Sequence, residues 1–223
     1  MPSRDTEGGR RVLKVYNKIM NNLTIITLKE PNVTDFAAER NALLKEVKTP
    51  WVLFLDADER LTPQLKSEIA KAISLDDYSA YYLKRQDTFL GRDLKHGETG
   101  HARLLRLAKK DFGTWQRPVH ERWVGQGRVG QLSSPILHHP HATVSSFLAK
   151  INLYSTLEAE YRFRQGLKSS LFKIALYPLA KFKWNYFVKL GFLDGTPGAI
   201  MAIMMSFHSY LTWTKLYLLW HKK

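Results

Sequence analysis

The segment Trp51–Glu59 (WVLFLDADE) decides the fold class of this chain. Its first five residues are a continuous apolar run of strand length, typical of a strand buried on both faces of a parallel sheet. Three acidic residues follow within four positions, where that strand ends. Ligands of open α/β sheets bind outside the carboxyl ends of the strands. The segment therefore predicts an α/β fold with a ligand site at this strand end.

The flanking residues fit an alternation of helices and strands. Residues 23–28 are short and β-branched, which favours a strand. Asp35 and Thr62 each precede a helix-periodic apolar run and are expected to cap helices, the first over 36–47. Apolar residues spaced by three and four also predict a helix at Arg11–Met20. This order indicates βαβ units and a mostly parallel, Rossmann-like sheet.

The pattern changes after the third predicted helix. Two strands and then a loop-rich stretch are expected at 79–84, 102–107 and 108–145. The remainder is helical in pattern, with interruptions expected at Pro178 and at 191–198. We therefore expect an α/β domain over residues 1–145 and a helical segment over residues 146–223.

Composition narrows the functional classes. The chain has 223 residues, 44% of them hydrophobic and 24% charged, which suits a folded core and excludes a disordered chain or a protein with many membrane spans. It has no cysteine, which rules out a disulfide framework, a cysteine-based zinc finger and a cysteine nucleophile. Lys and Arg outnumber Asp and Glu by 34 to 20. An anionic partner is therefore expected: a phosphate-bearing substrate, a nucleic acid or a membrane surface.

The helical segment is the most basic part of the chain. Residues 146–223 carry 11 basic and 3 acidic side chains, a net charge of +8. Near the carboxyl terminus, one helical face collects His208, Thr212, Lys215 and Lys222, and apolar side chains occupy the rest. This amphipathic pattern predicts peripheral or monotopic attachment to anionic lipid on the cytoplasmic face of the inner membrane. The alternatives are a helix over residues 198–219 that spans the bilayer, for which it is long enough, and a helix that packs on its own domain.

The acidic residues at the strand end suggest a metal site. Asp56 and Asp58 are two apart in a segment leaving the sheet, so both carboxylates can turn toward one hard cation. Carboxylates, waters and substrate phosphates are the usual ligands of Mg²⁺ or Mn²⁺. The alternative is that these acids favour the positive end of the helix starting near Thr62. Because they follow a fully apolar strand, the metal site is the favoured interpretation.

Several short motifs share one resemblance. Residues 41–63 (NALLKEVKTPWVLFLDADERLTP) resemble the metal-binding segment of family 2 glycosyltransferases with a GT-A fold. They are most similar to bacterial enzymes that add sugars to lipopolysaccharide core or other surface glycans. The resemblance continues, in the expected order and over most of the chain, through FAAERN (36–41), FLGRD (89–93), RLLR (103–106), VHE (119–121) and the tail 177–198.

The resemblance implies roles for individual residues. Asp56 and Asp58 match the D-x-D that holds a divalent metal, Mg²⁺ or Mn²⁺, on the diphosphate of a nucleotide-sugar donor. Arg40 and Asn41 match a pair beside the nucleotide and phosphate site. Glu121 matches the carboxylate that accepts the proton of the acceptor hydroxyl in an inverting transfer, as such a reaction requires. The acceptor implied is a lipopolysaccharide core or another lipid-linked surface glycan.

Some of these assignments have alternatives. Glu121 is equally consistent with a surface acid paired with Arg117 or Arg122. Most histidines are expected to be hydrogen-bonded loop residues, and the resemblance makes one late histidine a further candidate metal ligand. The candidates are His138, His139 and His141.

The resemblance is incomplete at the amino terminus. A complete domain of this kind begins with a strand, a helix and a strand ending in a D-x-x-S-x-D-like nucleotide segment. Only Pro2–Thr6 (PSRDT) is similar to the end of that segment, so we expect one βαβ unit, ~30 or more residues, to be missing. A non-catalytic remnant or partner subunit is therefore the alternative function. Nucleic-acid binding is weakest, because no RNP-like strand or recognition helix accompanies the charge.

Overall fold

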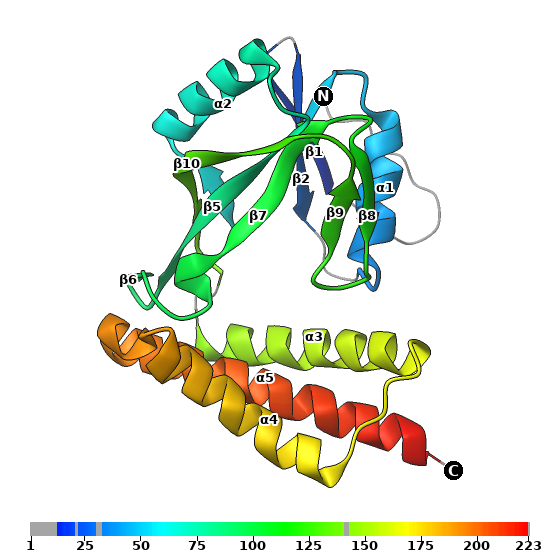
Figure 1. Cartoon of the computed structure of the whole chain (residues 1–223), viewed down its shortest axis with the longest axis vertical. Coiled ribbons are helices and arrows are strands. Elements are labelled where there is room, and N and C mark those ends of the chain that lie inside the picture. Colours follow the sequence, from blue (N-terminus) through cyan, green and yellow to red (C-terminus); the bar gives the residue numbers. More distant parts are fainter. Residues whose placement is uncertain (1–12, 21, 30–32, 141–142, 223) are drawn as a thin grey trace.

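The structure is a computed structural model that describes residues 13–20, 22–29, 33–140 and 143–222. A mixed sheet with helices on its faces forms the upper part in Figure 1, and a layer of long helices lies below it. Pro2–Thr6 lies outside the described residues. The upper part contains β1 (Leu13–Met20), β2 (Leu23–Lys29), α1 (Phe36–Glu46), β3 (Trp51–Asp56), β4 (Glu59–Leu61), α2 (Pro63–Leu75), β5 (Ala80–Phe89), β6 (Arg92–Leu94), β7 (Arg103–Lys109), β8 (Gly113–Gln116), β9 (Arg122–Gly125) and β10 (Val129–His138).

The main sheet has the strand order β1-β2-β3-β7-β5-β10-β4, with β6 beside β5. The pairs β2–β3 and β5–β10 are parallel, and the other described pairs are antiparallel. The α/β class is confirmed, but the expectation of a mostly parallel sheet is wrong. The physical reason lies in the connections: β5 reaches β7 without a crossover α-helix, and strands joined in this way pair antiparallel.

Strand β3 lies in the interior of the sheet and is buried along Trp51–Leu55, as the apolar run predicts. Its side chains alternate between two cores. Leu53 and Leu55 belong to the cluster that includes α2, while Val52 and Phe54 belong to the cluster that includes α1, β8 and β9. With both faces covered, the polar end of β3 is the part of the strand that remains available to a ligand.

The helices of the α/β part begin where their caps predict. The Asp35 carboxylate accepts a hydrogen bond from the Ala38 N–H at 2.9 Å. The Thr62 hydroxyl accepts one from the Leu65 N–H at 3.1 Å, and Pro63 occupies the first turn. Both side chains satisfy backbone donors that have no partner inside the helix. The parallel unit β2–α1–β3 is thereby confirmed as a βαβ unit.

Two expectations about secondary structure are wrong. The predicted helix at Arg11–Met20 is strand β1 over its described residues, paired antiparallel with β2 so that Met20 lies opposite Leu23. Its Val, Tyr and Ile residues also favour strands, and pairing with β2 decides between the two patterns. The expected loops of 108–145 contain β8, β9 and β10. Although β10 contains Ser and Pro residues, which are common in turns, it runs between β5 and β4 with a register shift between Gln131 and Pro135.

The lower layer contains α3 (Val144–Arg164), α4 (Leu171–Lys183) and α5 (Gly195–His221), with the π-helical turn η2 (Trp184–Val188) and the 3₁₀ turn η3 (Gly191–Asp194) between α4 and α5. The helical character of this segment is confirmed. Pro178 lies inside α4 and does not interrupt it. Its carbonyl accepts a hydrogen bond from the Ser206 hydroxyl of α5 at 2.8 Å, so packing between the two helices holds the segment helical.

Helix α5 packs against both α3 and α4, and its polar face points inward. Thr212 is buried, and the Lys215 ammonium donates to Asn152, Ser155 and Thr156 of α3. For these residues the structure matches one of the alternatives given above, a helix that packs on its own chain, because α3 supplies their hydrogen-bond partners. Among the described helices no single one is long and apolar enough to cross a membrane. The pair Leu171–Val188 and Gly191–His221, bent by 69°, meets that test only together.

Candidate active site

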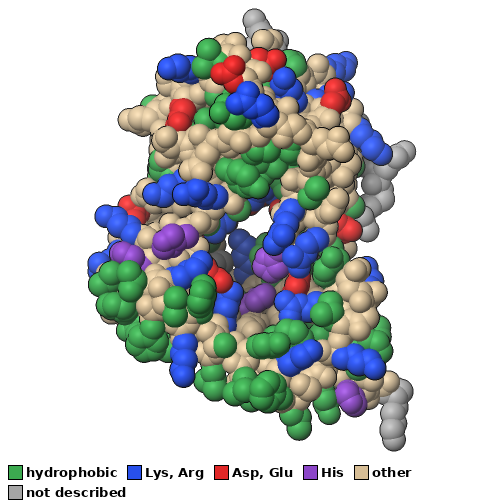
Figure 2. Space-filling model, viewed as in Figure 1, with side chains coloured by type: hydrophobic (Ala, Val, Ile, Leu, Met, Phe, Trp, Pro, Cys, Tyr) green, Lys and Arg blue, Asp and Glu red, His purple; other side chains and the backbone are tan. Residues whose placement is uncertain are grey.

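A cavity of about 590 Å³ lies between the sheet and the helical layer. On the sheet side its walls combine apolar side chains with six charged ones: Arg40, Asp56, Asp58, Arg85, Arg106 and Glu121. On the helical side they are formed by Phe147, Lys150 and Tyr154 of α3 and by Met205 and His208 of α5. Figure 2 shows a hollow in the centre of this face, with histidine and basic side chains around it. The α/β part and the helical layer thus build the cavity jointly.

Asp56 stands at the end of β3 between two buried arginines. Its Oδ1 accepts a hydrogen bond from Arg40 Nη2, and its Oδ2 accepts one from Arg106 Nη2, both at 2.7 Å. Arg40, from α1, is 1% exposed and stacks over the Trp115 ring at 4.7 Å. The Nη1 atoms of both arginines are buried and have no hydrogen-bond partner among the described residues. Their N–H groups are unused hydrogen-bond donors beside the cavity.

Glu121 shares the Arg40 guanidinium with Asp56. Its Oε1 lies 2.9 Å from Arg40 Nη2 and 3.7 Å from Arg106 Nη1, while Oε2 has no ion pair or hydrogen bond within the described ranges. Glu121 therefore pairs with neither Arg117 nor Arg122, the partners considered in its alternative assignment. One carboxylate oxygen is anchored, and the other is available to a molecule in the cavity.

The loop that carries Glu121 is fixed at both sides. The Phe36 N–H donates to the Pro118 carbonyl at 2.9 Å, which ties the loop to the start of α1. Arg117 donates to both carboxylate oxygens of Glu158 on α3 at 3.1 Å. Arg117 and His120 both have positive φ, at 73° and 51°, a backbone conformation that costs energy in residues with a side chain. Contacts from two directions hold this strained loop in place.

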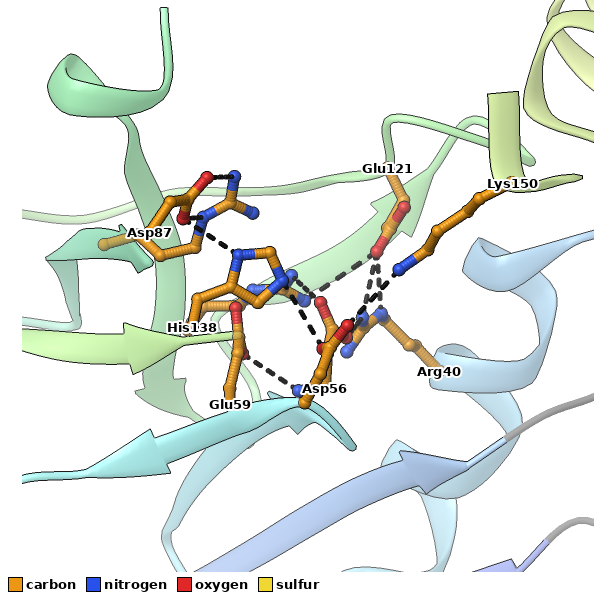
Figure 3. A network of polar contacts seen from close by, with 10 residues as sticks. Arg40, Asp56, Glu59, Asp87, Glu121, His138 and Lys150 are labelled. Atoms are coloured by element: carbon orange, nitrogen blue, oxygen red, sulfur yellow. Dashed lines mark hydrogen bonds and ion pairs between the residues drawn. The ribbon is translucent and has the colours of Figure 1, made fainter. Parts of the chain in front are cut away.

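Asp58 lies beyond the strand end, close to His138 and Lys150. Figure 3 shows the side chains of His138 and Asp87 pointing toward one another within this network. The sheet register explains the first contact, because His138 of β10 is paired with Glu59 of β4 and with Asp87 of β5. Asp87 accepts a hydrogen bond from His138 Nδ1 at 2.8 Å, and Nε2 faces Asp58 Oδ1 at 3.5 Å. Lys150 donates to Asp58 Oδ2 at 3.3 Å. Of the three late histidines, the structure brings His138 to the acidic pair. His141 lies outside the described residues.

These contacts shift the pKa values of the acids. Burial raises the pKa of Asp56, but the charges of Arg106 and Arg40 outweigh burial and hold it well below its usual range. Burial likewise opposes ionisation of Asp58, and the contacts with His138 and Lys150 lower its pKa to about 2. In contrast, burial and the nearby Asp56 charge raise the pKa of Glu59. The carboxylates of Asp56 and Asp58 are therefore ionised at neutral pH.

Asn41 occupies a different place from the other predicted site residues. Its side-chain N–H donates to the Trp115 carbonyl at 2.8 Å, and its Oδ1 accepts from the Trp115 N–H at 2.9 Å. Both polar groups of the amide are thus engaged with the backbone of β8. Asn41 does not contribute to the cavity wall, whereas Arg40, Asp56, Asp58 and Glu121 do.

The structure adds site residues that the sequence reasoning did not assign. Arg106 is the clearest, and its signal was visible: a charged residue between two leucines of a predicted strand. Lys150 and Tyr154 are one helical turn apart on α3 and both reach the cavity. Burial and the charges of Asp56 and Glu121 raise the pKa of Tyr154, which keeps its hydroxyl protonated. Nothing in the sequence of α3 distinguishes these two residues from other helix positions.

The charged cavity at the end of β3 coincides with a family match. The model of glycosyl transferase family 2 matches residues 3–128, which is more than half of the chain. The chain belongs to glycosyl transferase family 2. The resemblance inferred from the motifs is therefore confirmed at the level of the family. The match includes Arg40, Asp56, Asp58, Arg106 and Glu121, and it ends before His138 and the helical layer.

Individual glycosyltransferases are similar over a larger share of the chain. The lipopolysaccharide core biosynthesis glycosyltransferase LpsC of Rhizobium meliloti is 26% identical over 186 residues, which cover 82% of this chain and 69% of LpsC. Uncharacterized glycosyltransferases of Rickettsia typhi and Rickettsia prowazekii are each 26% identical over 179 residues, or 74% of this chain. The matched region spans 61% of the length of each of these two Rickettsia relatives.

Proposed function

We propose that the protein transfers a sugar from a nucleotide-sugar donor to a hydroxyl of a lipopolysaccharide-core or other lipid-linked surface glycan. The observation that carries this proposal is a cavity in which Asp56 and Glu121 contact two buried arginines and Asp58 lines the same wall. Family membership supports glycosyl transfer, and the likeness to LpsC supports the acceptor class. In this proposal residues 1–145 hold the donor, and residues 146–223 complete the acceptor side of the cavity.

Asp56 and Asp58 are proposed to bind Mg²⁺ or Mn²⁺ together with the donor diphosphate. Within the described residues, no group of three His, Cys, Asp or Glu side chains is arranged to hold a metal alone. The two carboxylates still fit such an ion, because these cations take several ligands from waters and substrate phosphates. His138 suits a supplementary role: Asp87 holds its Nδ1–H, which directs Nε2 toward Asp58. A metal ion would replace any proton on that nitrogen.

The basic groups of the cavity are proposed to stabilise the departing diphosphate. Among the described residues, the Nη1 atoms of Arg40 and Arg106 have no hydrogen-bond partner, and Lys150 approaches from α3. Positive charge placed where negative charge develops lowers the barrier of such a transfer. Arg40 fits the phosphate role that the resemblance assigns to it. For Asn41, whose amide bonds the β8 backbone, nucleotide binding stays a prediction.

Glu121 is proposed as the general base of an inverting transfer. Its free Oε2 would accept the proton of the acceptor hydroxyl while the oxygen of that hydroxyl forms a bond to the anomeric carbon of the donor sugar. The bond from that carbon to the diphosphate oxygen breaks in the same step, and the diphosphate leaves with the electron pair. Asp93 and Glu98 would be the next candidates for the base, but they are engaged elsewhere, with Thr88 and Lys181 respectively.

Calorimetry with a nucleoside diphosphate tests the donor site. We expect binding by the unmodified chain to strengthen when Mn²⁺ is present, and Asp58→Asn and Asp56→Asn to lose that metal-dependent gain. Asp76→Asn is a matched control, because Asp76 is exposed and pairs with Lys109 away from the cavity. A metal-dependent gain that persists in Asp58→Asn would refute the metal assignment.

A further inference from the structure

The outer side of the helical layer carries a large share of the exposed apolar surface. The described part of the chain exposes 25 large hydrophobic side chains, and 11 of them lie within residues 171–193. Figure 2 shows hydrophobic side chains gathered over this lower part of the molecule, with Lys and Arg among them. We call this surface the α4 face; it consists of Phe172, Leu176, Leu179, Trp184, Phe187 and Val188. Apolar clusters of this kind mark interaction sites.

Helical geometry places the α4 face on one side. Phe172, Leu176 and Leu179 are spaced by four and three residues, so they form one stripe along α4. Phe172 is 67% exposed and Leu179 is 58% exposed. Pro178, in contrast, is buried and bonds to Ser206 of α5. The stripe therefore points away from α5 and from the cavity.

The charge around the α4 face has a single sign. From 161 to 222 the sequence has nine Lys and Arg residues and one acidic residue, Asp194. Asp194 is buried and accepts hydrogen bonds from His96, so its negative charge is not presented at the surface. Lys181 pairs with Glu98. Lys183 and Lys189, which border the apolar stripe, have no ion pair within the part of the chain that the structure describes.

We propose that the α4 face docks on a bilayer containing anionic phospholipid, with α4 lying in the plane of the interface. Aromatic and aliphatic side chains would enter the headgroup boundary, and Lys183 and Lys189 would contact lipid phosphates. A second copy of the chain fits this face poorly, because a symmetric contact would bring like charges together. A spanning orientation fits poorly too, since no single described helix is long and apolar enough to cross the hydrocarbon core, and the pair that meets the test together is bent by 69°.

The sequence prediction assigned membrane contact to residues 146–223 as a whole, and the proposal narrows that contact to the α4 face. It is also independent of sugar transfer, because lipid binding requires neither donor nor acceptor. Failure of one proposal would therefore leave the other standing.

Sedimentation with lipid vesicles tests the docking surface. We expect the chain to bind vesicles of phosphatidylcholine and phosphatidylglycerol at low salt, and to bind pure phosphatidylcholine less. The triple variant Phe172→Ser, Leu176→Ser, Leu179→Ser should weaken binding at least roughly tenfold, since it removes the apolar contribution. The double variant Lys183→Glu, Lys189→Glu should weaken it by roughly tenfold or more, mainly at low salt. Circular dichroism checks that each variant is folded.

Helix α2 supplies matched controls. Leu75 is 58% exposed, and Lys66 and Lys71 are exposed on the same helix. Leu75→Ser and the double variant Lys66→Glu, Lys71→Glu should leave vesicle binding unchanged. Equal losses in the α2 and α4 variants, or no binding by the unmodified chain, would overturn the proposal. It would also be overturned by resistance to carbonate washing, which indicates a spanning helix, or by a dimer in solution that the α4 triple variant dissociates.

Discussion

At the scale of single residues, Arg40 is the centre of the site. It is almost fully buried, and one guanidinium contacts both Asp56, which is proposed for the donor, and Glu121, which is proposed for the acceptor. Removing one partner of a buried ion pair leaves an uncompensated charge and typically costs about 3–5 kcal/mol. Arg40 therefore fixes the separation of two acids with different proposed roles.

Glu121→Gln tests the base assignment. In a form of the protein that transfers sugar, we expect turnover to fall by roughly 10²-fold or more, because the amide cannot accept the hydroxyl proton. Nucleotide affinity, measured by calorimetry, should stay within about twofold, since the diphosphate is proposed to bind elsewhere. Glu160→Gln on the exposed side of α3 is the control. Near-normal turnover in Glu121→Gln would assign the base to another group.

At the scale of elements, α1 links the site to the two-stranded sheet of β8 and β9. Asn41 pairs with the Trp115 backbone much as a neighbouring strand would, and Trp115 in turn stacks on Trp123 with ring centroids 5.1 Å apart. The same Trp115 ring covers Arg40. The hydrogen bonds of Asn41 therefore hold Trp115 in the position where its ring shields Arg40 from water.

Asn41→Ala separates a structural role from nucleotide binding. We expect it to lower the free energy of unfolding by about 1–3 kcal/mol, because it leaves a buried backbone N–H and C=O of Trp115 without partners. Urea denaturation measures this loss, with Lys45→Ala on the exposed side of α1 as the control. A variant with unchanged stability but weaker nucleotide affinity would instead support direct contact with the nucleotide.

The predictability of the site differed between elements for physical reasons. Local signals were sufficient for α1, α2 and β3, since caps and a continuous apolar run are encoded in adjacent residues. They failed for β10, whose Ser and Pro residues suggest turns, because pairing with β5 and β4 decides its structure. Asp56, Asp58 and Glu121 were found as candidates from motifs. Lys150 was not, since its contact with Asp58 depends on how α3 packs.

At the scale of the whole molecule, the cavity lies at the interface between the α/β part and the helical layer. Met205 and His208 reach it from α5, which also packs against α4. If the α4 face lies on a bilayer, both α5 and α4 lie between the cavity and the membrane boundary.

His208, at this interface, also makes the stability of the protein depend on pH. Burial, assisted by neighbouring His120, lowers the pKa of His208 to about 4 from an ordinary value of 6.5. Glu158, Lys181 and Arg162 are the other charged groups that act on it. Between these two pH values the unfolded chain binds more protons than the folded one, so stability falls as pH drops. The full effect is on the order of 3 kcal/mol, at about 1.4 kcal/mol for each pH unit.

Denaturation of His208→Leu across this pH range measures the contribution. We expect the variant to lose less stability than the unmodified chain as pH falls from 6.5 to 4, because leucine has no proton to bind. His221→Leu, at the exposed end of α5, should retain the original pH dependence. Parallel pH profiles for His208→Leu and the unmodified chain would contradict the assignment.

The charge network at the end of β3 also has a consequence for the order of folding. Its contacts join residues far apart in sequence: 50 positions for Arg106 and Asp56, 81 for Arg40 and Glu121, and 92 for Lys150 and Asp58. Each contact closes a long loop, which is entropically costly and slow compared with forming a helix. We therefore expect the network to form after the βαβ unit and the helices have appeared. Formation of the contacts of Arg40 with Glu121 and of Arg106 with Asp56 would then mark the end of folding.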